Sequence, residues 1–206
     1  MSLVYSRRGA HLPPETRSKY EEVMKRIIAN ENEFSKNLAE EKTELRFSAE
    51  QLKGVPENTL ATLGRDGDQY IITMKYPDVI PILQFCSVSE TRKQVMTSFN
   101  NRGGPANLKL LEETICLRKE AVSILGYPDF PSYALENTMA EKPINVKEFL
   151  ENLRSKLEAS GKKEKEQLTQ FKHESGETGE MEPWDYSYYM NGLKEKLYHV
   201  YTKNRE

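Results

Sequence analysis

One pair of neighbouring residues has the side chains that hydrolysis at a metal ion requires. The run His173-Glu174-Ser175-Gly176-Glu177 matches the first two positions of the motif H-E-x-x-H, but not the last. In that motif two histidines one helical turn apart bind the same zinc ion, and the glutamate activates a water molecule. Here the fifth residue is an acid, and the serine and glycine before it are typical of a loop. We therefore interpret the match as a coincidence in a solvated loop.

The remaining histidines and both cysteines give no second candidate. Neither His11 nor His199 has a partner at metal-ligand spacing. Cys86 and Cys116 are too few for a disulfide framework in a chain of this length, and both lie among apolar residues. We predict that both thiols are buried, with a redox or metal role as the alternative. A second alternative places the histidine and glutamate of the H-E pair with His11 or His199 around a metal.

A glycine-containing segment, Arg102-Gly103-Gly104-Pro105, precedes a predicted helix. Backbone N–H groups at such a position can bind an anion, but no Lys-Ser/Thr pair follows at phosphate-loop spacing. We interpret the segment as a break between two helices.

Aromatic residues crowd the C-terminal segment, where they could stack on nucleic-acid bases or form a partner-binding face. They are Trp184, Tyr186, Tyr188, Tyr189, Tyr198 and Tyr201. Helical spacing favours a structural role instead. It predicts an ordinary core stripe of Tyr186, Met190, Leu193 and Leu197. The residues taken alone therefore predict no catalytic, no cofactor-binding and no metal-ligating position.

Charge and hydropathy limit the partners and the compartment. The 206 residues carry 30 Lys and Arg against 32 Asp and Glu, a net charge of −2, with no basic block, so nucleic acid is not expected as a partner. No run approaches the ~18 apolar residues of a membrane span, and residues 1–12 lack the apolar stretch of a secretory signal. We expect the cytoplasm; Arg7 and Arg8 without early acids leave the mitochondrion as the alternative.

Helical periodicity dominates the chain. Apolar residues at steps of three and four predict helices over residues 15–41, 106–125 and 145–157, and from Pro183 past Tyr201. The helix over 106–125 has two apolar stripes, which predict a central helix buried on two adjoining faces. One stripe is Leu108, Leu111, Ile115, Val122 and Leu125, and the other is Leu110, Leu117, Ala121 and Ile124.

Strand signals are few. The best candidate is the run from Tyr70 to Met74, rich in β-branched and aromatic residues, behind a tight turn at residues 65–68. We predict a mainly α, multi-helix bundle-like domain with one or two short strands near residues 60–75. Those strands should lie against the helices, because an isolated pair of strands is marginally stable. No domain boundary is visible, so residues 1–206 are expected to form a single helical region.

Several short segments carry a further signal, because they follow one another in a fixed order along the chain. They are Leu52-Lys53-Gly54-Val55-Pro56-Glu57, Tyr70-Ile71-Ile72-Thr73-Met74-Lys75-Tyr76-Pro77, Glu90-Thr91-Arg92, Asn101-Arg102-Gly103, Leu125-Gly126-Tyr127, Tyr133-Ala134-Leu135-Glu136 and Trp184-Asp185-Tyr186-Ser187-Tyr188-Tyr189-Met190. In this order they resemble the thimet oligopeptidase family of zinc metalloendopeptidases, which includes neurolysin and saccharolysin.

The resemblance implies a mostly helical protein of two lobes flanking a deep channel that admits short, unstructured peptides. It also implies a zinc ion held by H-E-x-x-H and a later glutamate. This chain resembles only the portion upstream of that motif, so no zinc or catalytic position of the family falls on any residue here. We expect no complete catalytic domain and no zinc bound by this chain itself.

Two functions follow as hypotheses, and the sequence leaves open whether the chain is an enzyme. The first is a partial zinc metalloendopeptidase, inactive alone, whose intact relatives cleave short peptides and which could pair with a complementary catalytic fragment. The second is a stand-alone helical module that binds peptides or proteins. Part of a larger protein would leave apolar faces exposed and would self-associate. A stand-alone module would be a stable monomer.

Overall fold

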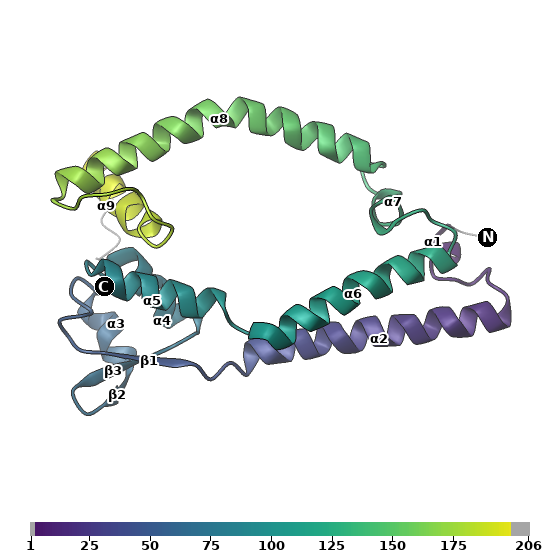
Figure 1. The fold of residues 1–206 in the computed structure, drawn as a ribbon, viewed down its shortest axis with the longest axis horizontal. Helices are drawn as coiled ribbons and strands as arrows, with labels where there is room; N and C mark the ends of the chain where they lie inside the picture. The colour runs from purple at the N-terminus through teal and green to yellow at the C-terminus, as the bar shows by residue number, and fades with distance from the viewer. Residues whose placement is uncertain (1–2, 199–206) are drawn as a thin grey trace. The chain divides into compact units, whose positions relative to one another are not determined.

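The computed structural model describes residues 3–198 of the chain (Figure 1). Within them the chain is mainly α-helical with one small antiparallel sheet, so the predicted fold class is confirmed. The chain divides by packing into two units, each built from two stretches: residues up to 40 with residues 103–156, and residues 41–102 with residues from 157 onward. None of the helices in the described part is both long and apolar enough to span a membrane.

The first unit is built around two long helices, α2 and α6, which lie side by side (Figure 1). It contains α1 (Leu3–Arg7), α2 (Pro14–Ala39), α6 (Gly104–Ile124), α7 (Phe130–Leu135) and residues 143–156 of α8 (Pro143–Glu174). The predicted helix over residues 15–41 is confirmed as α2. It begins at Pro14, where the fixed φ of proline suits the first helical position.

The core of this unit lies between α2 and α6. Apolar residues one helical turn apart on each helix face the other helix and are buried: Tyr20, Val23, Ile27, Leu117 and Ala121. A hydrogen bond of 2.8 Å from Asn37 Nδ2 to Asn107 Oδ1 links the same two helices. The pairing therefore combines an apolar seam with a specific polar contact.

The prediction that the helix over 106–125 is buried on two faces is wrong for its N-terminal half. One stripe of α6 packs on α2, but the N-terminal part of the other is solvent-exposed: Leu108, Leu111 and Ile115 are 56%, 47% and 59% exposed, whereas Val122 of the same stripe is buried. The main packing partners of α6 are α2 and α7. They leave Leu108, Leu111 and Ile115 uncovered in the described part of the chain.

The second unit combines the sheet with shorter helices. It contains β1 (Glu44–Phe47), α3 (Glu57–Thr62), β2 (Gly64–Asp66), β3 (Gln69–Thr73), α4 (Tyr76–Phe85), α5 (Ser89–Asn100), residues 157–174 of α8 and α9 (Tyr186–Tyr198). The strand order is β1-β3-β2, and both pairings are antiparallel. Strands β2 and β3 fall in the predicted region near residues 60–75. Strand β1 lies outside it and completes the sheet.

The core of the second unit lies between β3 and α4. Ile72 on the strand and Val79 and Ile82 on the helix are fully buried. The Asp78 carboxylate, in the first turn of α4, accepts hydrogen bonds from the Thr73 backbone N–H at 3.1 Å and from the Thr73 hydroxyl at 2.5 Å. An acid in this position accepts a hydrogen bond from the backbone N–H at the end of the strand, and its negative charge stabilises the N-terminus of the helix.

The two C-terminal helices differ from their predicted limits. The predicted helix over 145–157 is the first half of α8, which continues to Glu174. Alternating charges in its second half supply (i, i+4) pairs such as Lys162–Glu158 at 2.9 Å, which support a solvated helix. The helix predicted from Pro183 begins at Tyr186, and Tyr201 lies outside the described residues.

The core stripe predicted for α9 is also wrong. Tyr186 and Leu197 are 46% and 58% exposed, whereas Tyr189 is buried. Tyr189 packs edge-on against Phe171 of α8 with ring centroids 6.2 Å apart. The helix is therefore rotated relative to the predicted orientation, with a tyrosine rather than the aliphatic residues facing its neighbour.

Candidate functional site

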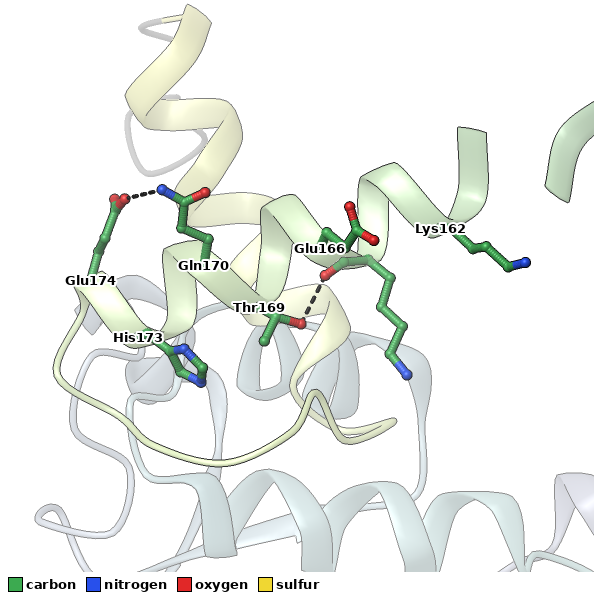
Figure 2. Close-up of a pocket in the computed structure, with 7 residues that line it drawn as sticks. Lys162, Glu166, Thr169, Gln170, His173 and Glu174 are labelled. Atoms are coloured by element: carbon green, nitrogen blue, oxygen red, sulfur yellow. Dashed lines mark hydrogen bonds between the residues drawn. The ribbon is translucent and has the colours of Figure 1, made fainter. Parts of the chain in front are cut away.

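His173 and Glu174 lie in the last turn of α8, and both are exposed. His173 Nε2 is 3.1 Å from the carbonyl oxygen of Gly179. The Glu174 carboxylate accepts a hydrogen bond of 3.0 Å from the Gln170 amide (Figure 2) and one of 2.8 Å from the Lys196 ammonium. These two donors, Lys196 foremost, lower the pKa of Glu174. The two side chains are thus held by separate local contacts.

An open cavity of about 550 Å³ lies against this face of α8 (Figure 2). Its lining residues are Lys162, Lys165, Glu166, Thr169, Gln170, His173 and Glu174. All of them belong to one helix, whereas a ligand site usually brings polar groups together from several elements. The cavity is the polar surface of a helix rather than an enclosed binding site.

The residues present do not fit a zinc site. Helix α8 ends at Glu174, and Gly176 adopts a left-handed conformation with φ 89°, so Glu177 does not lie one helical turn beyond His173. Among residues 3–198 no group of three His, Cys, Asp or Glu side chains could hold a metal ion. His11 is exposed in a turn, and His199 lies outside the described residues. Within residues 3–198, neither the half-match nor its alternative with His11 assembles the nitrogen and oxygen ligands that zinc requires.

A second polar cluster lies elsewhere in the second unit, and its charged side chains are buried and hydrogen-bonded to one another. Asp185, directly before α9, accepts hydrogen bonds from Arg92 of α5 and Lys172 of α8. Arg92 Nη2 is 2.6 Å from Asp185 Oδ1, and Lys172 Nζ is 2.7 Å from Asp185 Oδ2. All three side chains are buried, with exposed fractions of 6% or less. We call these three residues the buried charge cluster.

Neutral groups complete the surroundings of the buried charge cluster. Arg92 Nη1 donates to the Cys86 carbonyl oxygen at 2.8 Å, and the guanidinium lies 4.3 Å from the centre of the Tyr188 ring. The Ser89 hydroxyl donates to Asp185 Oδ1 at 3.3 Å and accepts a hydrogen bond of 3.1 Å from the Trp184 indole. The N-cap residue of α5 is Val88, so the Ser89 hydroxyl is free for these two contacts.

The electrostatics of the cluster suit a structural link rather than acid–base chemistry. Burial alone would raise the pKa of Asp185, but Lys172 and Arg92 outweigh it and hold the pKa below its usual value. Both carboxylate oxygens accept hydrogen bonds from charged donors, which favours the ionised form of Asp185. The cluster joins α5, α8 and α9, and it fixes where α9 begins.

The other positions considered from sequence have structural roles. Gly103, at φ 74°, is the N-cap of α6 and marks the predicted break after α5. Arg102 donates to the Phe99 carbonyl oxygen at 2.8 Å. Cys86 is buried as predicted, but Cys116 is exposed on α6, so its predicted burial is wrong.

Arg92, Lys172 and Asp185 were not recognised as a cluster from the sequence. Two of the three nevertheless fall in segments quoted for the family resemblance, Glu90-Thr91-Arg92 and Trp184-Asp185-Tyr186. Nothing local in these segments indicates that the two charges meet.

Comparisons with known proteins agree with one another. The model of peptidase family M3 matches residues 82–206, the stretch that contains the buried charge cluster. The chain is 38% identical to the thimet-like oligopeptidase of Dictyostelium discoideum, over 90% of this chain and 28% of that protein. It is 37% identical to saccharolysin of Saccharomyces cerevisiae, over 91% of this chain and 28% of that protein.

A bacterial relative also matches nearly the whole of this chain with only part of its own length. Oligopeptidase A of Escherichia coli is 29% identical, over 93% of this chain and 31% of that protein. The chain thus spans between a quarter and a third of the length of these curated relatives.

Proposed function

Because the chain belongs to peptidase family M3, we propose that it is the upstream helical portion of a zinc oligopeptidase that cleaves short peptides. The family match over residues 82–206 is the observation that carries this proposal. The resemblance inferred from short sequence segments is confirmed at the level of the family, and an oligopeptidase-like role in proteolysis follows from the named relatives. The cytoplasm is the proposed compartment, with the mitochondrion as the alternative.

In this proposal the 206 residues do not cleave peptides on their own. The sequence contains three histidines, and no two of them are spaced as in H-E-x-x-H. His173 and Glu174 are held by different neighbours rather than directed at one point. Zinc would be bound by a complementary catalytic polypeptide, while this chain supplies helical surface beside the peptide.

A hydrolysis assay tests the proposal. The purified chain is incubated with a fluorogenic bradykinin-type peptide and added zinc, with and without a chelator, and purified saccharolysin serves as the positive control. We expect turnover by the control and none above background by the chain. Chelator-sensitive turnover that follows the chain through purification and is lost in His173→Ala would contradict the proposal.

A further inference from the structure

We draw no further inference here: the strongest candidate, the small cavity in the second unit between the end of α4 and the helices α8 and α9, carries no ligand assignment, because the Glu195 carboxylate oxygen in its lining that has no hydrogen-bond partner among residues 3–198 is itself closed off from solvent, and nothing in the structure shows what would reach it.

Discussion

Arg92 and Asp185 are 93 positions apart in the chain, yet they form an ion pair of 2.6 Å whose side chains are 0% and 1% exposed. Lys172 joins the same carboxylate from a third helix. A buried ion pair is costly to form because both charges lose water, but it is more costly to break, because one charge is then left buried without its partner. This asymmetry makes the protein sensitive to substitution of Asp185.

Asp185→Asn should therefore destabilise the protein strongly. The amide keeps the shape of the side chain but leaves Arg92 and Lys172 buried without a counter-charge, which typically costs about 3–5 kcal/mol. The free energy of unfolding in urea measures the loss. Glu113→Gln is the matched control, since it removes an ion pair of the same 2.6 Å length, with Arg26, on the surface. The control should change stability little, and equal losses in the two variants would contradict the assignment.

The same carboxylate predicts an acid-sensitive fold. The pKa of Asp185 is lowered in the folded chain, so its contribution to stability is complete above its ordinary value, near 4. It is lost as the pH falls through the lowered folded value. Thermal unfolding between pH 7 and pH 2 should show a steeper acid decline for the natural chain than for Asp185→Asn. Parallel curves would show that Asp185 does not titrate as the geometry requires.

The sequence predicted only part of the fold and did not predict the buried charge cluster. Helical periodicity located α2 and α6 because a stripe repeating every three to four residues survives local exceptions. It could not show that the N-terminal part of one stripe of α6 is exposed, because Leu108 and Leu117 look alike until the neighbouring helices are placed. Strand β1 was missed because it has four residues and a single buried side chain, Phe47, which is too short for alternation to be recognised. The meeting of Arg92 and Asp185 depends on the fold itself.

Two glycines should respond to alanine in opposite directions. Gly54 has φ +93°, and a Cβ there would lie 2.5 Å from the Phe85 carbonyl oxygen. Gly54→Ala should therefore cost about 1–3 kcal/mol through backbone strain. Gly161 lies inside α8 with open space around its Cα, so Gly161→Ala should stabilise the helix by about 0.5–1 kcal/mol. Urea unfolding compares the two, and a stabilising Gly54→Ala would contradict the described backbone.

The two thiols should react at very different rates. Cys116 is exposed on α6, whereas Cys86 is buried and its pKa is raised by burial. The thiolate is the reactive form, so burial and a raised pKa both slow Cys86. With a chromogenic disulfide reagent under native conditions, one thiol per chain should react quickly and the second only on unfolding. Cys116→Ser should remove the fast phase; two fast thiols in the natural chain would contradict the burial of Cys86.

The central claim of the proposed function is that the 206-residue chain supplies helical surface but no set of side chains that binds a catalytic metal ion. Equilibrium dialysis of the purified chain against micromolar zinc, followed by metal analysis, tests it most directly. The account predicts zinc well below one ion per chain, with no change in His173→Ala. One tightly held zinc per chain, released by that substitution, would contradict it.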